Sequence, residues 1–154
     1  MENIKYSKPL VYDIEAMQNL VSPEVEKGLI LYRTPSEMAT TIRSYIVAKD
    51  QGQIIGFVAL HIHSVTLAEV RSLIVKEEYR KVGIGQNLVK RALDEASALG
   101  LKEVLTLTYH KSLFEKIGFH EIPKESIPEQ KIWADCIRCK HFPICDEVSL
   151  IIKL

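Results

Sequence analysis

The sequence predicts a mixed α/β fold in which a central sheet is flanked by helices. Segments with the composition of β-strands alternate with segments of helical periodicity, and the chain closes on a hairpin pattern instead of a further helix. A strand-to-helix turn at residues 80–85 contains two glycines. The 154 residues contain no internal repeat and no linker, so we expect a single domain covering residues 1–154.

Four segments have the features of helices. In residues 11–21 and 86–99, apolar side chains recur at three- and four-residue spacing, as in a helix that buries one face. Gly100 follows the second segment at the position of a left-handed C-cap. Ser36 is a good N-cap for a helix that extends through Tyr45. The expected helices are residues 11–21, 36–45, 86–99 and 112–117.

The strand pattern begins with a hairpin. Residues 46–48 and 54–62 are rich in apolar residues and are joined by the turn Asp50-Gln51-Gly52. Residues 68–75 are rich in β-branched side chains and end in an apolar run, as expected of a buried central strand. The expected strands are residues 46–48, 54–62, 68–75, 104–108, 131–134 and 148–153, of which the last two form the closing hairpin.

The composition excludes several classes of partner. Lys and Arg together number 20, as do Asp and Glu, so no basic excess points to nucleic acid. The longest apolar stretch, residues 54–60, is far shorter than the roughly 20 residues that span a bilayer. The N-terminus lacks the apolar region of a signal peptide. We therefore expect a cytoplasmic protein with no nucleic-acid and no membrane partner.

The turn at residues 80–85 reads Arg-Lys-Val-Gly-Ile-Gly. Its glycines let the backbone approach a ligand closely, and the N–H groups and dipole of the following helix favour an anion such as a pyrophosphate. No Gly-Lys-Ser/Thr follows, as a P-loop requires, and Leu88 occupies the third glycine position of the dinucleotide fingerprint. A tight connection without any ligand is the alternative interpretation.

The segments around this turn resemble the GNAT acetyltransferases. Arg80, Gly83 and Gly85 match the family signature Arg/Gln-x-x-Gly-x-Gly/Ala between a strand and a helix, and residues 113–119 match its second motif, which ends in Gly-Phe. The resemblance implies that acetyl-coenzyme A is the acetyl donor, with its pyrophosphate on the turn and its pantetheine arm along the preceding strand. The residues implied for coenzyme A are Leu73, Ile74, Val75, Arg80, Lys81, Val82, Gly83, Ile84, Gly85 and Gln86.

Acetyl transfer to an amine requires a group that accepts a proton from the ammonium form and a group that protonates the departing thiolate. Glu69 lies at the position that several GNAT enzymes use for the base, which makes it the candidate base; an exposed strand carboxylate is the alternative. Many members of the family carry a tyrosine as the acid where this chain has Phe114. Tyr109 is therefore the candidate acid, with a packing role as its alternative and Ser112 as a weaker candidate.

Within this family, the sequence resembles in particular the acetyltransferase domain of N-acetylglutamate synthases. The matching stretches are residues 28–34, 69–73, 105–108 and 114–119. This implies an amino-acid acceptor, with L-glutamate leading, and a role in arginine biosynthesis. A dicarboxylic amino acid requires cations, and a guanidinium can hold a carboxylate with two hydrogen bonds. Arg33 and Arg71 are the candidates for substrate binding, Lys111 is a weaker third, and solvated or ion-paired arginines are the alternative.

Three cysteines and a histidine lie close together near the C-terminus. They are Cys136, Cys139, His141 and Cys145, in a loop at residues 135–147. This set could bind zinc in a tetrahedral site. It contains a single Cys-x-x-Cys, so buried structural thiols are the favoured interpretation and zinc is the alternative. Similar loops occur in short single-domain proteins that resemble amino-acid acetyltransferases.

Two further functions compete with an amino-acid acetyltransferase. The acceptor could be another amine, such as a polyamine, an antibiotic or a protein N-terminus, because GNAT folds change acceptors by changing loops. A coenzyme-A-binding or metal-binding sensor without catalysis is the alternative from another class. His61 and His63 alternate with apolar neighbours and are interpreted as structural, with a proton relay to a nearby Glu69 as the alternative. The resemblance allows a homodimer, which no residue in the sequence requires.

Overall fold

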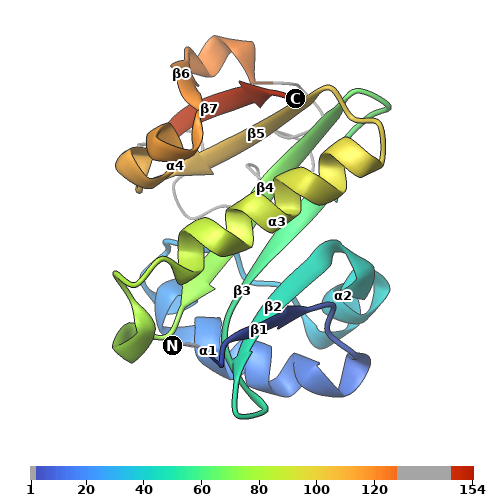
Figure 1. The fold of residues 1–154 in the computed structure, drawn as a ribbon, viewed down its shortest axis with the longest axis vertical. Coiled ribbons are helices and arrows are strands. Elements are labelled where there is room, and N and C mark those ends of the chain that lie inside the picture. The colour runs from blue at the N-terminus through green and yellow to red at the C-terminus, as the bar shows by residue number, and fades with distance from the viewer. Residues whose placement is uncertain (1–2, 128–146) are drawn as a thin grey trace.

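A seven-stranded mixed sheet organises the computed structural model, which describes residues 3–127 and 147–154 (Figure 1). The strands are β1 (Lys5–Ser7), β2 (Tyr45–Asp50), β3 (Gln53–Ile62), β4 (Leu67–Val75), β5 (Glu103–Thr108), β6 (His120–Ile122) and β7 (Val148–Lys153). The order across the sheet is β1-β2-β3-β4-β5-β7-β6, and β4 and β5 form its parallel pair. The predicted mixed α/β fold is confirmed.

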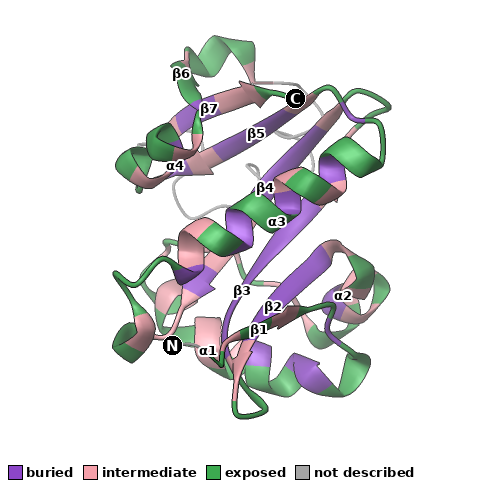
Figure 2. Cartoon of the chain, in the orientation of Figure 1, coloured by how far each residue is buried: buried purple, intermediate pink, exposed green. Residues whose placement is uncertain are grey.

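Helices cover both faces of this sheet (Figure 1). The α-helices are α1 (Ile14–Glu26), α2 (Pro35–Thr40), α3 (Ile84–Ala98) and α4 (Lys111–Ile117). On one face, Leu88 of α3 and Val58 of β3 belong to one buried cluster, and on the other, Met17 of α1 and Met38 of α2 pack with Phe57. Figure 2 shows the buried residues along the middle of the sheet and on the inner side of α3. No helix in residues 3–127 or 147–154 is long and apolar enough to cross a membrane.

The helix expected over residues 36–45 is shorter than the sequence predicts. It begins one residue earlier because Thr34, not Ser36, is its N-cap: the Glu37 N–H donates to Thr34 Oγ1 at 3.1 Å, and the Thr34 N–H donates to Glu37 Oε1 at 3.0 Å. This capping box satisfies two N–H groups that a helix start leaves without partners. The helix ends at Thr40, and Thr41 Oγ1 donates to the Glu37 carbonyl at 2.7 Å. Tyr45 belongs to β2.

The helix expected over residues 11–21 is displaced toward the C-terminus. Residues Val11–Asp13 form a 3₁₀ turn, η1, and α1 runs from Ile14 to Glu26. The last turn of α1 lies at the surface, with no fully buried residue, so it adds no apolar period to the sequence pattern. The predicted helices 86–99 and 112–117 are confirmed as α3 and α4, each with bounds that differ by one or two residues.

The sequence pattern did not predict two short strands. β1 and β6 have three residues each and lie at the two edges of the sheet. Strands this short carry too few residues to show alternation. The expected strand at 148–153 is confirmed as β7, which pairs with β5 and β6, whereas the expected strand at 131–134 lies outside the described residues. The hairpin strands at 46–48 and 54–62 are confirmed as β2 and β3.

The parallel strands β4 and β5 separate after a short pairing. Their register covers Leu67 with Glu103, Ala68 with Val104, and Glu69 with Leu105. At the next residue of each strand, a side chain connects β5 to β4, because Thr106 Oγ1 donates to the Val70 carbonyl at 2.9 Å. Ser72 then adopts φ of 58°, in the left-handed region that side chains rarely occupy. The second half of β4 therefore leaves β5 and forms a wall of the space between them.

Candidate active site

A cavity of about 940 Å³ lies where β4 and β5 separate. Its walls come from the last turn of α1 with the segment that follows it, from β4, from the turn and first residues of α3, and from the end of β5 with α4. Ile127 and Glu147, which flank the part of the chain that the structure does not describe, also line it. The volume suits an elongated ligand of drug size or larger.

The turn before α3 presents its backbone to this cavity. Lys81 and Gly83 have φ of 66° and 91°, which turns the chain sharply before α3 begins at Ile84. The Asn87 N–H donates to the Gly83 carbonyl at 3.0 Å, which closes the first helical turn. The N–H groups at the start of a helix have no partner within it and attract anions. This geometry fits the pyrophosphate of coenzyme A.

Gly85 keeps the mouth of this turn open. A methyl group at its Cα would lie 3.7 Å from Val75 Cγ2 and 3.8 Å from Leu113 Cδ2, across the cavity wall. These are ordinary contact distances, so the protein alone tolerates a side chain there. The space that a side chain would occupy is the space between the turn, β4 and α4, which a ligand on the turn would need.

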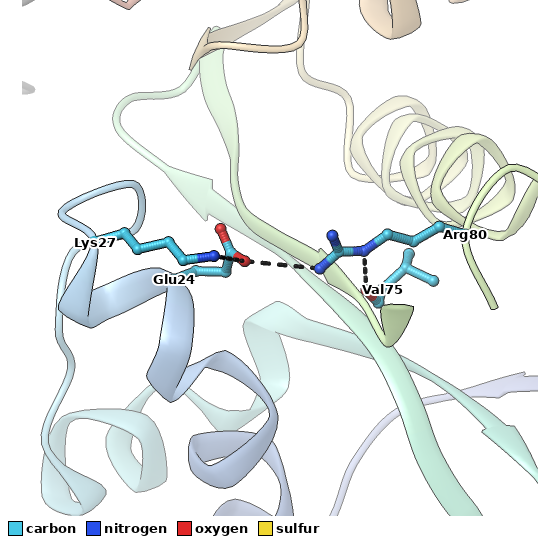
Figure 3. Close-up of polar contacts among 4 residues, drawn as sticks. All are labelled: Glu24, Lys27, Val75 and Arg80. Carbon is cyan, nitrogen blue, oxygen red and sulfur yellow. Dashed lines mark hydrogen bonds and ion pairs between the residues drawn. The ribbon is translucent and has the colours of Figure 1, made fainter. Parts of the chain in front are cut away.

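Arg80 links the turn to β4 and to α1 (Figure 3). Its Nε donates to the Val75 carbonyl at 2.8 Å, and one terminal nitrogen lies 3.7 Å from Glu24 Oε1. Lys27 also approaches this carboxylate, at 4.0 Å. Glu24 is the least exposed member of this group, with 16% of its side chain accessible. The carboxylate therefore holds two cations at the rim of the cavity.

Most residues implied for coenzyme A lie on the cavity wall. They are Leu73, Ile74, Val75, Arg80, Lys81, Gly83, Gly85 and Gln86. Val82 and Ile84 do not line it. Val82 is 52% exposed at the surface, whereas Ile84 is buried in the core against the sheet. Both positions are part of the turn, where backbone N–H groups would act and side chains would not.

Glu69 is a fully buried carboxyl group on the wall of the cavity, with a residue accessibility of 1%. Its Oε1 lies 2.9 Å from His63 Nε2, and the His63 side chain is also buried. The alternative of an exposed strand carboxylate is therefore wrong. Burial of an ionised carboxyl group is costly unless a hydrogen-bonding partner compensates for it, and His63 is such a partner.

Tyr109 and Phe114 also line the cavity. Tyr109 follows β5 directly and is 36% exposed. Phe114 is buried in α4, where its ring packs edge-on against Phe119 with centroids 5.2 Å apart. The second motif thus places an aromatic ring without a hydroxyl group at the cavity wall, and Tyr109 supplies a hydroxyl group nearby on the same wall.

Arg33 and Arg71 are brought together from distant parts of the sequence. Both line the cavity, Arg33 from the segment before α2 and Arg71 from β4. The positive charges of both arginines also influence the hydroxyl group of Tyr45. Burial raises the pKa of Tyr45, and the charges of Arg33 and Arg71 oppose this rise. The two arginines therefore line the same cavity and lie within electrostatic range of the same tyrosine.

The structure does not bring Lys111 into the site. Among the described residues that line the cavity, Lys111 is absent, although its neighbour His110 is present. Its Nζ lies 2.8 Å from Glu121 Oε1 and 4.0 Å from Glu115 Oε2, and these two carboxylates raise its pKa. Lys111 is thus a surface cation that connects α4 to β6.

Residues 135–146 of the cysteine loop lie outside the described part of the chain. This applies to Cys136, Cys139, His141 and Cys145 alike. In residues 3–127 and 147–154, no group of three or more His, Cys, Asp or Glu side chains could hold a metal ion.

Three lysines on the cavity wall had no signal in the sequence. Lys27 follows α1, Lys116 lies in α4, and Lys124 belongs to the 3₁₀ turn η4 (Lys124–Ser126). They are widely separated in the chain, so no spacing pattern connects them. Their ammonium groups add positive charge to a cavity whose turn already favours an anion.

Comparison with known proteins agrees with this geometry. Residues 41–121 match the acetyltransferase (GNAT) domain model. An uncharacterized N-acetyltransferase of Chlorobaculum tepidum is 39% identical over 139 residues, which cover 90% of this chain and 89% of that protein. This chain therefore belongs to the GNAT family of acetyltransferases, and it is an N-acetyltransferase that uses acetyl-coenzyme A as the acetyl donor.

Two more distant matches are longer proteins. An amino-acid acetyltransferase of Vibrio cholerae is 26% identical over 121 residues, which cover 77% of this chain and 27% of that protein. The N-acetylglutamate synthase of Neisseria gonorrhoeae, crystallised with coenzyme A and N-acetyl-glutamate, superimposes with a TM-score of 0.86 at 20% identity, covering 98% of this chain and 35% of that one. The chain thus spans about a third or less of these proteins, and the structural match shows the shared fold.

Proposed function

We propose that this chain transfers the acetyl group of acetyl-coenzyme A to the amino group of a small amino acid, with L-glutamate as the leading acceptor and arginine biosynthesis as its role. The observation that carries the proposal is the pair Arg33 and Arg71 on the wall of the cavity that also contains Glu69. Two guanidinium groups suit an acceptor with carboxylates and disfavour a polyamine. The amino-acid acetyltransferase relative and the N-acetyl-glutamate complex point to the same class of acceptor.

In the proposed reaction, Glu69 is the base. Its carboxylate takes one proton from the ammonium group of the acceptor, because only the neutral amine is a nucleophile. Acetyl-coenzyme A supplies an activated acetyl group, whose C–S bond breaks as the C–N bond to the amine forms. The nitrogen loses a second proton to solvent as the amide forms, the sulfur gains a proton from an acid, and that acid regains a proton from solvent. The proton on Glu69 is then released to solvent.

Tyr109 is the proposed donor of the proton to the sulfur. It lies on the cavity wall at the end of β5, across the opening from β4. Phe114 cannot serve, because a phenyl ring carries no exchangeable proton. Its place at the wall instead excludes water from the region in which the acetyl group would lie.

We further propose that residues 1–154 form one catalytic domain. The sheet supports this division, since it includes β1 near the N-terminus and β7 at the C-terminus. The turn before α3, the carboxyl group of Glu69 and the two arginines all belong to the same cavity. A unit of this size therefore contains every group that the proposed reaction uses.

A thiol-release assay with acetyl-coenzyme A tests the acceptor. The panel contains L-glutamate, L-glutamine, L-aspartate, L-ornithine, spermidine and a neutral peptide. We expect turnover with L-glutamate to exceed turnover with every other amine. Turnover restricted to spermidine or the peptide would reject the amino-acid acceptor and leave the acetyltransferase class intact.

A further inference from the structure

The buried pair of Glu69 and His63 joins two cavities. Glu69 lines the large cavity, and His63 lines a second cavity of about 300 Å³. The atoms Glu69 Oε1 and His63 Nε2 are 2.9 Å apart, and the two side chains are 1% and 3% exposed. The carboxyl group thus belongs to the wall of the ligand space and also contacts an imidazole that lines a different cavity.

The backbone and a second histidine fix the position of the imidazole. The His63 N–H donates to the Leu67 carbonyl at 2.9 Å, which holds the turn between β3 and β4. The His61 ring packs edge-on against the His63 ring with centroids 4.8 Å apart, and His61 is the cross-strand partner of Glu69. The ring that contacts the carboxyl group is therefore held from two directions.

The two oxygens of a carboxylate are equivalent until a partner distinguishes them. We propose that His63 is the positioning residue of the base: its Nε2–H holds Oε1 of Glu69, so that the other oxygen takes the proton of the acceptor amine. The proposal rests on the assignment of Glu69 as the base. It adds a residue that acts through Glu69 and touches neither the acceptor nor acetyl-coenzyme A.

A hydrogen bond from the imidazole has two consequences for the base. It keeps the carboxylate in one orientation, so that each bound acceptor meets a preorganised oxygen. It also stabilises the ionised form of a buried carboxyl group, which is the form that accepts a proton. Other charged or titratable groups around the pair are His61 on β3, Arg71 on β4 and Glu103 at the second cavity.

Two substitutions separate positioning from simple packing. His63→Gln keeps an amide N–H about where Nε2–H lies, whereas His63→Leu removes every donor while filling a similar space. His120→Gln is the matched control, because His120 is exposed on β6. The readouts are kcat, the KM values for acceptor and acetyl-coenzyme A, the pH profile and the melting temperature, with whichever amine the wild type acetylates.

We expect His63→Leu to lower kcat by about 10- to 100-fold, a part of the 10²- to 10⁴-fold that a positioned base contributes. The KM for acetyl-coenzyme A should stay within about twofold, because His63 lies away from the turn before α3. The acidic limb of kcat/KM should move to higher pH, since the carboxylate loses a donor that favours its ionised form. His63→Gln should restore most of kcat, and His120→Gln should behave as the wild type.

A double variant keeps the test decisive if His63→Leu is poorly folded. His63→Ala also removes the donor, and Glu69→Gln combined with His63→Ala should be no slower than Glu69→Gln alone, because the imidazole acts through the carboxylate. Wild-type kcat and pH profile in folded His63→Leu, or additive losses in the double variant, would overturn the role of His63 alone. A fully active Glu69→Gln would overturn the base and with it the positioning role, whatever amine serves as acceptor.

Discussion

The Nε of Arg80 donates a 2.8 Å hydrogen bond to the carbonyl oxygen of Val75, which joins the turn before α3 to the end of β4. The same guanidinium lies 3.7 Å from Glu24 in α1. One side chain therefore connects the three elements that surround the proposed pyrophosphate site. The family motif places an arginine at this position, and the structure gives a physical reason for it.

Replacement of Arg80 should weaken the binding of acetyl-coenzyme A more than it weakens the fold. We expect Arg80→Ala to raise the KM for acetyl-coenzyme A by about tenfold, because the turn loses its link to β4 and a positive charge near the phosphates. Arg43→Ala, at an exposed arginine of the 3₁₀ turn η2 (Ile42–Ser44), is the charge-matched control and should leave this KM unchanged. Equal KM values in both variants would show that Arg80 has no part in binding.

Two glycines with positive φ allow the effect of backbone strain on folding to be distinguished from an effect on ligand binding. Gly83 and Gly52 have φ of 91° and 79°, and a Cβ at either position would meet no atom within 4 Å. Alanine should therefore cost about 1 kcal/mol of folding free energy at each position, because an L-residue is strained at positive φ. Chemical denaturation measures this cost.

The two alanine variants should differ in ligand binding. Gly83→Ala should raise the KM for acetyl-coenzyme A by about tenfold, because strain at the N-cap displaces the first N–H groups of α3. Gly52→Ala, in the turn between β2 and β3, should leave it unchanged. A similar KM in both variants would contradict the anion site at the start of α3.

The arginines should control the acceptor and not the donor. Arg33→Gln and Arg71→Gln should each raise the KM for L-glutamate by about tenfold or more, because each removes a charge-assisted contact to a carboxylate. The KM for acetyl-coenzyme A should change little. Lys111→Gln is the control, since Lys111 is paired with Glu121 outside the cavity. An effect of Lys111→Gln as large as that of the arginine variants would contradict the proposed carboxylate site.

The buried hydroxyl group of Tyr45 contributes one component of the stability of the protein at alkaline pH. Burial raises its pKa above the ordinary value of 10.0, against the opposing charges of Arg33 and Arg71. The unfolded chain releases this proton at lower pH than the folded one, so the contribution of Tyr45 to stability is complete below the unfolded pKa and is lost as the pH rises through the folded pKa. Tyr45→Phe should remove this component, which urea denaturation between about pH 8 and pH 11 would measure. An identical alkaline loss in both proteins would contradict this assignment.

Much of the fold follows from patterns that are local in sequence. The apolar stripe of α3, the glycine after it and the β2–β3 hairpin are each visible within a window of about 15 residues. The errors lie where a competing local signal decided the boundary. Thr34 and Glu37 form a capping box that begins α2 one residue earlier than expected, and β1 is defined by its pairing with β2 more than by its own three residues.

The candidate site was predictable only where a motif or a family position marked it. A motif or a family position marked Arg80, Gly83 and Glu69, and all three line the cavity. The contact between Glu69 and His63 depends on the register of β3 against β4 and on the turn between them, which the composition of either strand leaves open. Lys111 was the weaker third candidate cation, and its ion pair with Glu121 on β6 holds it outside the cavity.

The central claim is that this enzyme acetylates the amino group of an amino acid that carries carboxylates. Its most direct test is a competition in which L-glutamate, L-glutamine and spermidine, at equal concentrations, share limiting acetyl-coenzyme A and the products are identified by mass spectrometry. The account predicts N-acetylglutamate as the main product, with its share falling in Arg33→Gln and Arg71→Gln. A predominance of acetylspermidine, or a product ratio that neither arginine variant alters, would contradict it.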